Sequence, residues 1–122
     1  MKHLIRRKMG NNKYRNREKV IDNIVFQSTK EANRYQDLKL LQKAGEISGL
    51  KLQPEFILQL GFTDFEGKKH RPITYRADFS YLEKGKNVVE DVKSPATRTG
   101  VYMIKKKMLL YNYHEIFFKE IY

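Results

Sequence analysis

Residues 73–93, ITYRADFSYLEKGKNVVEDVK, alternate apolar and polar side chains through their first ten positions. One face collects Ile73, Tyr75, Ala77, Phe79 and Tyr81, and the other collects Thr74, Arg76, Asp78, Ser80 and Leu82. A period of two residues predicts a β-strand. A second strand, from Asn87 to Lys93, follows the polar residues 83–86. The stretch therefore predicts a β-hairpin, and the remaining chain is interpreted around it.

The hairpin turn fixes which side chains lie opposite one another. If Lys84-Gly85 is a two-residue turn, Glu83 pairs with Lys86, and the same register places Asp78 across from Asp91. Opposed side chains have Cβ atoms about 4.5 to 5.5 Å apart, so the two carboxylates repel each other. A divalent cation between them would supply the missing positive charge, and hard ions such as Mg²⁺ take oxygen ligands of this kind.

The same register leaves alternatives open at this face. It places Arg76 across from Lys93, which sets two cations beside the two acids. The face could instead be exposed to solvent, with its charges simply hydrated. A shift of one residue would bring Glu90, in place of Asp91, onto the face of Asp78. On an ideal strand Glu90 points away from Asp91.

The rest of the chain predicts a mixed α/β or α+β domain with a central mixed sheet flanked by helices. A short hairpin is expected over Glu18–Phe26 around Asp22-Asn23. Ser28 and Glu31 match a capping box at the start of a helix that ends near residue 43, before Gly45. The expected order is hairpin, helix, three strands, helix, strand. The other elements are strands over 50–60 broken at Pro54, a second helix with Val101, Ile104, Met108 and Tyr111 on one stripe, and a closing strand over 114–121.

Composition limits the classes of function. The chain has 122 residues, a net charge of +11 and no cysteine, which excludes disulfides, zinc-thiolate sites and iron–sulfur clusters. No apolar stretch is long enough for a membrane span, and the basic N-terminus lacks the features of a signal peptide. A cytoplasmic domain that binds a polyanion is the first interpretation.

The positive charge is concentrated in two blocks. Residues 1–19 carry a net charge of +7 and residues 93–107 carry +5, so the remainder sums to −1. Residues 1–16 are expected to form a flexible basic arm, and residues 17–122 a single domain. A solvated helix face together with a disordered arm would explain the same blocks. The side chains expected to meet DNA phosphates are Arg6, Arg7, Lys8, Lys13, Arg15, Arg98 and Lys105.

Ala77-Asp78 followed by Asp91-Val92-Lys93 resembles the PD-(D/E)XK signature of the restriction-endonuclease-like nucleases, with Ala77 at the position of the nominal proline. Over roughly residues 13–120 the chain is similar to a family of small phage-encoded proteins that are presumed to be endodeoxyribonucleases. The resemblance implies a restriction-endonuclease-like core. It also implies hydrolysis of DNA with Mg²⁺, or with Mn²⁺ as a substitute, and a homodimer like those of the Holliday junction resolvases.

The resemblance also implies roles for individual residues. Asp78 and Asp91 would be metal ligands, together with the backbone carbonyl of Val92. Glu31 would complete the acidic site or hold a water, although the capping box explains Glu31 equally well. Lys93 would orient or help deprotonate the attacking water and stabilise charge on the phosphate.

Two further classes remain as alternatives. A non-catalytic basic module would bind nucleic acid and use its acids only for structure. A small adaptor in a phage assembly would show neither cleavage nor strongly salt-dependent DNA affinity.

Overall fold

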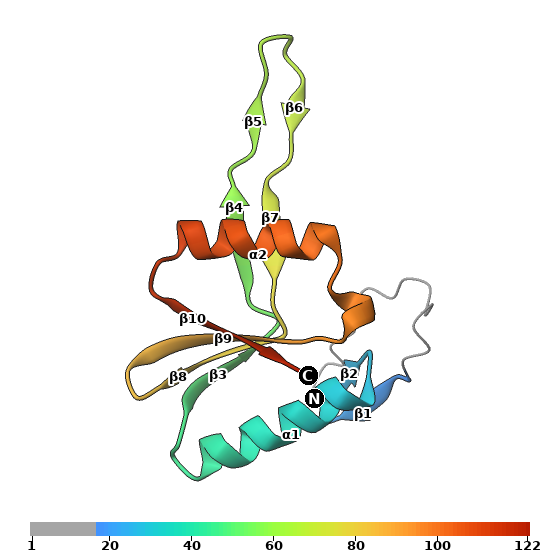
Figure 1. The fold of residues 1–122 in the computed structure, drawn as a ribbon, viewed down its shortest axis with the longest axis vertical. Coiled ribbons are helices and arrows are strands. Elements are labelled where there is room, and N and C mark those ends of the chain that lie inside the picture. The colour runs from blue at the N-terminus through green and yellow to red at the C-terminus, as the bar shows by residue number, and fades with distance from the viewer. Residues whose placement is uncertain (1–16) are drawn as a thin grey trace. The chain divides into compact units, whose positions relative to one another are not determined.

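The computed structural model describes residues 17–122 (Figure 1). The predicted arm of residues 1–16 lies outside these residues. The chain divides into two compact units, one up to Ile47 and one of Ser48–Tyr122, and each is described by itself. The described chain is α+β, with two α-helices and a mixed multi-stranded sheet, as the sequence predicts at this level.

The first unit is a hairpin followed by a helix. Strands β1 (Lys19–Ile21) and β2 (Ile24–Phe26) pair antiparallel around Asp22 and Asn23, which both have positive φ as a type I′ turn requires. This confirms the predicted hairpin. The Tyr35 hydroxyl donates to Asp22 Oδ2 over 2.8 Å, so the turn is tied to the helix.

Helix α1 (Thr29–Lys43) has the predicted boundaries. The Ser28 hydroxyl accepts the backbone N–H of Glu31 over 3.1 Å, which confirms that half of the capping box. Gly45, with φ of 81°, follows the helix end, where a left-handed residue is common. The buried side of α1 carries Ala32, Tyr35 and Leu38 at helical spacing.

The second unit contains a four-stranded mixed sheet in the order β10-β9-β8-β3. Its strands are β3 (Ser48–Leu52), β8 (Phe79–Glu83), β9 (Lys86–Val92) and β10 (Ile116–Ile121). Strands β8 and β9 pair in the predicted register, from Glu83 with Lys86 to Phe79 with Glu90. Strand β10 runs parallel to β9. A short 3₁₀ helix, η1 (Pro95–Thr97), and helix α2 (Gly100–Asn112) connect these two strands.

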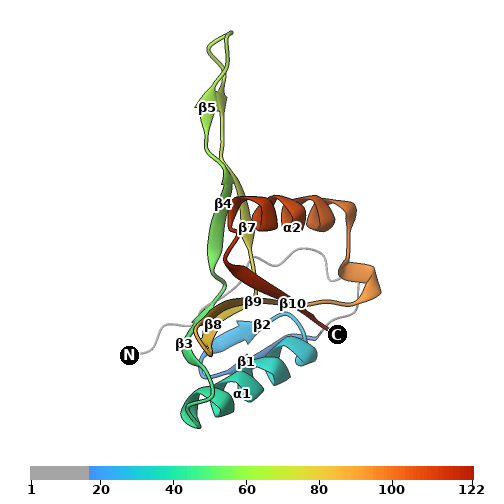
Figure 2. The same cartoon turned by 60° about the vertical axis from the view of Figure 1, so that its left-hand side comes forward.

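A second antiparallel ladder leaves this sheet. Strand β4 (Glu55–Gln59) pairs with β7 (Ile73–Arg76), and the two chains continue outward as β5 (Phe62–Thr63) and β6 (Lys69–His70). Figures 1 and 2 show this ladder rising past α2. The structure therefore has seven strands between the two helices, where the sequence predicted three.

The prediction of one continuous strand over 73–82 is wrong. The chain leaves β7 at Ala77-Asp78 and enters β8 in a different sheet. The opposite chain breaks at the same level, where Gln53 has a φ of 52° and Pro54 has no N–H for a ladder. The two breaks hydrogen-bond to each other, from Ala77 N–H to the Pro54 carbonyl and from Gln53 N–H to the Asp78 carbonyl. The alternation across the break survives, because the odd-numbered side chains stay on the buried side.

Helix α2 packs against β4 and β7, but of the apolar stripe noted in the sequence only Met108 packs against the core. Val101, Ile104 and Tyr111 are 65%, 64% and 76% exposed, whereas Tyr102 and Leu109 are buried. Helix α2 carries apolar side chains on several of its faces, so the spacing of these residues alone does not identify the face that packs against the core. The core beneath α2 consists of Leu58, Tyr75, Ala77, Val89, Tyr102 and Leu109.

Two adjacent leucines test this face of the helix. Leu109→Ala should lower the free energy of unfolding by about 2 to 5 kcal/mol, because Leu109 is fully buried in the core. Leu110→Ala, the matched control, should cost less than about 1 kcal/mol because Leu110 is 39% exposed. Chemical denaturation of both variants measures the difference. Equal losses would contradict the assigned packing face.

Candidate active site

The break between β7 and β8 presents Asp78 to the neighbouring strand. Asp78 is buried, although it belongs to the face whose other members are mostly exposed or half-buried. Its backbone N–H donates to the Glu90 carbonyl over 3.1 Å, so the pairing of β8 with β9 extends one residue beyond the strand. Asp78 is therefore held at the position that the hairpin register predicts.

Asp78 and Asp91 are joined by reciprocal hydrogen bonds. The Asp78 backbone N–H donates to Asp91 Oδ1 over 2.9 Å, and the Val92 N–H donates to Asp78 Oδ2 over 2.8 Å. Asp91 is buried as well. The structure thus brings the two predicted acids together, each anchored on the backbone of the other strand. These N–H groups offset part of the repulsion between the two carboxylates, which from the sequence was expected to be compensated by a cation alone.

The donor set matches the chemistry of Mg²⁺. Asp78 and Asp91 offer hard carboxylate oxygens, and Mg²⁺ is commonly held by one or two carboxylates with waters and substrate phosphates. The Val92 N–H is bonded to Asp78, and a ligand role for the Val92 carbonyl stays a prediction. Within residues 17–122 there is no group of three or more His, Cys, Asp or Glu side chains arranged to hold a metal. A site of two carboxylates completed by water and phosphate fits this arrangement, whereas a cage made entirely of protein ligands does not.

Asp91 opens onto a cleft of about 410 Å³ in the second unit. Lys93, the residue directly after β9, lines the same cleft, as its spacing of two residues from Asp91 predicts. The cleft also includes cationic and hydroxyl side chains that could meet phosphate oxygens, namely Arg76, Lys105, Thr97 and Thr99. The predicted opposition of Arg76 to Lys93 is wrong as a register pair, because Arg76 pairs with Glu55 in the β4–β7 ladder.

Lys93 is seated on an aromatic ring. Its Nζ lies 4.1 Å from the centroid of the Tyr102 ring, a close cation–π contact. The Tyr102 hydroxyl donates to Glu120 Oε2 over 2.7 Å, and Arg98 Nε donates to the same oxygen over 2.9 Å. Lys106 forms an ion pair with the other oxygen of Glu120 over 3.3 Å. A single carboxylate therefore fixes the side chain that supports Lys93.

These contacts change the ionisation of both supporting groups. Burial acts to raise the pKa of the Glu120 carboxyl, but hydrogen bonds from Arg98, Tyr102 and Lys106 outweigh burial and lower it to about 2. Burial raises the pKa of the Tyr102 hydroxyl far above its usual range, and its hydrogen bond to Glu120 raises it further. Glu120 is thus charged and Tyr102 neutral near neutral pH.

Sequence reasoning missed Tyr102 and Glu120. The parallel register of β10 with β9 pairs Glu120 with Asp91, which places it at the site. The sequence predicted a closing strand but neither its partner nor its direction. Tyr102 could have been found from Thr99, whose hydroxyl accepts the Tyr102 N–H over 3.2 Å and so starts α2 beside the site.

Other predicted residues have different surroundings. Glu90 is fully buried and accepts a hydrogen bond from the Tyr81 hydroxyl, which agrees with its expected direction away from Asp91. Glu31 lies in the first turn of α1, in the first unit, and is buried; its role as a ligand stays a prediction. Arg98 is engaged with Glu120, whereas Lys105 lines the cleft. The predicted DNA contacts Arg6, Arg7, Lys8, Lys13 and Arg15 lie outside the described residues.

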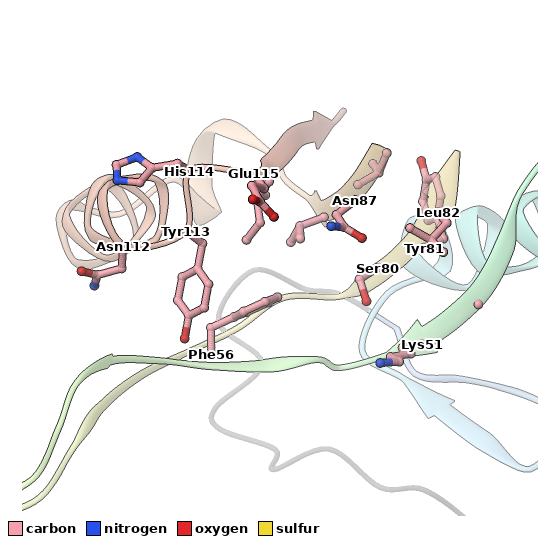
Figure 3. Close-up of a pocket in the computed structure, with 14 residues that line it drawn as sticks. Lys51, Phe56, Ser80, Tyr81, Leu82, Asn87, Asn112, Tyr113, His114 and Glu115 are labelled. Carbon is pink, nitrogen blue, oxygen red and sulfur yellow. The ribbon is translucent and has the colours of Figure 1, made fainter. Parts of the chain in front are cut away.

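A larger cleft of about 630 Å³ lies elsewhere in the second unit. Figure 3 shows Tyr113 above Phe56 toward one end, and Ser80 and Lys51 toward the other. Its lining includes none of the predicted site residues. Since it has no group of acids and cations comparable to Asp91 with its neighbours, the smaller cleft is the candidate active site.

The comparisons with known proteins give a family but no function. Residues 11–121 match the model of a family described as a protein of unknown function, DUF1064. No curated protein and no solved structure matches the chain. Neither helix in the part of the chain that the structure describes is long and apolar enough to span a membrane.

The low pKa of Glu120 predicts an acid-dependent loss of stability. A carboxyl whose pKa is lowered by folding stabilises the folded protein at pH values above 4.5, the ordinary pKa of a glutamate. This stabilisation is lost as the pH falls toward about 2, the pKa of Glu120 in the folded protein. Wild type should lose on the order of 1 to 2 kcal/mol of unfolding free energy from this group across that window, allowing for solvent screening. Denaturation of wild type and Glu120→Gln at several pH values measures the difference between them.

That difference should be large at neutral pH and shrink toward about pH 2. Glu115→Gln, at an exposed acid, is the control and should track wild type throughout. A difference between wild type and Glu120→Gln that stays constant with pH would contradict the assigned network.

Proposed function

The chain belongs to the DUF1064 family, and we propose that it is a Mg²⁺-dependent endodeoxyribonuclease that hydrolyses DNA phosphodiester bonds. The observation that carries this proposal is the pair of interlocked carboxylates, Asp78 and Asp91, of which Asp91 lines a cationic cleft together with Lys93. Acids that hold a cation and a lysine that meets the phosphate are the groups that phosphodiester hydrolysis needs.

We also propose that the second unit is a restriction-endonuclease-like core. The hairpin of β8 and β9 carries Asp91 and is flanked by Asp78 and Lys93, and α2 leads from it to β10, which lies parallel to β9. Ala77, at the position of the nominal proline, is fully buried, so a small side chain suits the break between β7 and β8. The order of strand, strand, helix, strand around the site supports the resemblance to PD-(D/E)XK nucleases.

Asp78 and Asp91 would hold Mg²⁺, with the Val92 carbonyl as a further candidate ligand. When bound, Mg²⁺ supplies Lewis-acid polarisation of the phosphodiester and makes a nearby water a better nucleophile. Reciprocal hydrogen bonds fix both carboxylates before any cation arrives, so little reorganisation is needed at the site.

Lys93 would act on the phosphate itself. Its ammonium is held at the cleft by the Tyr102 ring, which contributes no competing negative charge. From there Lys93 donates to a phosphate oxygen as negative charge develops and orients the attacking water. Lys105 and the Thr99 hydroxyl, which line the same cleft, would position the flanking DNA backbone.

The wider setting completes the proposal. A small chain has little surface for reading bases, so a branched or flapped DNA structure is the preferred substrate, as for a Holliday junction resolvase. Two symmetric cuts would need a homodimer. The proposed setting is phage DNA metabolism in the host cytoplasm. The competing function is a basic DNA-binding module without catalysis, because the backbone N–H groups of Asp78 and Val92 already compensate part of the charge on the two carboxylates.

Substitutions at the site separate the two functions. Asp91→Asn keeps the Oδ1 acceptor for the Asp78 N–H, so the fold should persist while Mg²⁺-dependent cleavage falls by at least about 100-fold. Lys93→Ala should lower cleavage comparably, and EDTA should abolish it. Incubation with linear, flapped and four-way DNA, with electrophoresis of the products, measures cleavage. Anisotropy with labelled DNA measures binding, which should be retained.

Asp37→Asn, at an exposed acid of α1, is the matched control and should cleave like wild type. Melting temperatures of all variants check the fold. Wild-type protein that binds these DNAs but cuts none of them with Mg²⁺ or Mn²⁺ would establish the non-catalytic module instead.

A further inference from the structure

The ladder of β4 and β7 extends beyond the core as a projecting arm, which we define as residues 60–72. Leu58 is the last residue of β4 that belongs to the core cluster. Beyond it, the arm holds only the short pairing of β5 with β6, and Figures 1 and 2 show it projecting past α2. None of residues 60–72 belongs to the core cluster beneath α2.

The tip of the arm is ordered by one carboxylate. Asp64 Oδ1 accepts the backbone N–H groups of Glu66 and Lys68 over 2.9 and 3.0 Å, and Asp64 Oδ2 contacts His70 Nε2 over 2.8 Å. The hydrogen bond from His70 holds the pKa of Asp64 below its usual value. Gly67, with φ of 85°, closes the turn. The tip therefore has a defined shape before it meets any partner.

One aromatic side chain of this turn is fully exposed to solvent. Phe65 is 106% exposed, the largest exposure among the exposed large hydrophobic residues. Phe62, by contrast, is half exposed and stacks on the His70 ring at 4.6 Å between centroids. A rigid turn that leaves one ring entirely in water is suited to insertion into a partner, because little ordering is needed on contact.

The charges beside Phe65 favour a nucleic acid as that partner. Lys68, Lys69 and Arg71 are all exposed on the returning strand. Of the two acids in the arm, Asp64 is occupied by the turn and His70, which leaves Glu66 as the opposing charge. Aromatic rings interleaved with cations bind DNA by stacking on bases while the cations meet phosphates.

The β4–β7 ladder connects the arm to the candidate active site. Arg76 and Glu55, at the inner end of the β4–β7 ladder, line the same cleft as Asp91 and Lys93. From Arg76 to Phe65 an extended strand reaches up to about 35 Å, which is close to one turn of B-form DNA. If DNA lies in the cleft and along the arm, Phe65 would reach the base stack of the DNA about ten base pairs from the phosphodiester bond that is cleaved.

We propose that the arm is a DNA-binding element and that Phe65 stacks on bases left exposed at a branch or flap, about one helical turn from the phosphate held at Asp91 and Lys93. This rests on the proposed function in taking DNA as the substrate. The arm selects DNA by its structure, since a continuous duplex offers no open stack for the ring.

Binding is measured in the Asp91→Asn background with EDTA, so that cleavage does not interfere. Phe65→Ala should weaken binding to four-way and flapped DNA by about 5- to 100-fold and affect linear duplex little. Phe65→Trp should keep wild-type affinity. Tyr111→Ala removes another exposed ring from the same unit and should have no effect. Melting temperatures should change little in all three variants, because Phe65 is fully exposed and Tyr111 is 76% exposed with only a ring contact to His114.

Two further measurements locate the DNA on the arm. The fluorescence of 2-aminopurine placed beside the branch should be quenched by the parent protein and not by Phe65→Ala. Substituting both Lys68 and Lys69 by Gln should reduce the slope of log affinity against log salt by about 0.9 for each phosphate that the variant no longer neutralises.

Unchanged affinity of Phe65→Ala for every DNA would overturn the proposal. So would a Phe65-dependent change in sedimentation without DNA, which would make the arm a contact between copies of the chain. If wild type shows Phe65-dependent binding to branched DNA but no cleavage with Mg²⁺, the assignment of the arm stands and the proposed nuclease activity fails. If wild type cleaves and Phe65→Ala binds and cleaves equally well, only the assignment of the arm fails.

Discussion

The hydrogen bonds from the Asp78 N–H to the Asp91 carboxylate and from the Val92 N–H to the Asp78 carboxylate fix how β8 and β9 meet at the candidate site. Hydrogen bonds to charged groups contribute about 1.5 to 3 kcal/mol each, and a buried carboxylate without them is costly. A shift of one residue between β8 and β9 would break both contacts and leave two acids buried without these donors. The acids therefore specify the register of the hairpin that carries them, so chemistry and fold depend on the same contacts.

The bend between the two ladders creates the space in which this chemistry would take place. The four-stranded sheet and the β4–β7 ladder are separate sheets, and the chain passes between them at Pro54 and at Ala77. At these residues β4 and β7 turn away from the sheet that contains β9. The inner end of the departing ladder forms one wall of the cleft, and β9 with the residue that follows it supplies Asp91 and Lys93. Helix α2 packs on this ladder and contributes Tyr102, so the support of Lys93 comes from across the bend.

Local patterns in the sequence predicted the hairpins and the start of α1, because turn residues such as Lys84-Gly85 and the Ser28 cap act within a few residues. The register of one hairpin was enough to place Asp78 beside Asp91. Long-range relations were not predictable. The sequence does not state that β10 would join β9 in parallel, so Glu120 was missed. The packed face of α2 was not identified either, since its exposed positions are as apolar as its buried ones.

The parallel pairing of β10 with β9 also determines the order in which the site can be assembled. Strands β8 and β9 are joined by a tight turn and can pair as soon as both have left the ribosome, which brings the two aspartates together early. Lys93 is anchored by residues of β10. The Tyr102 ring that supports its ammonium is held by Glu120, and the Lys93 backbone N–H donates to the Ile121 carbonyl over 2.7 Å. The two acids can therefore meet as soon as β8 and β9 pair, whereas the complete constellation requires β10, which follows only after α2.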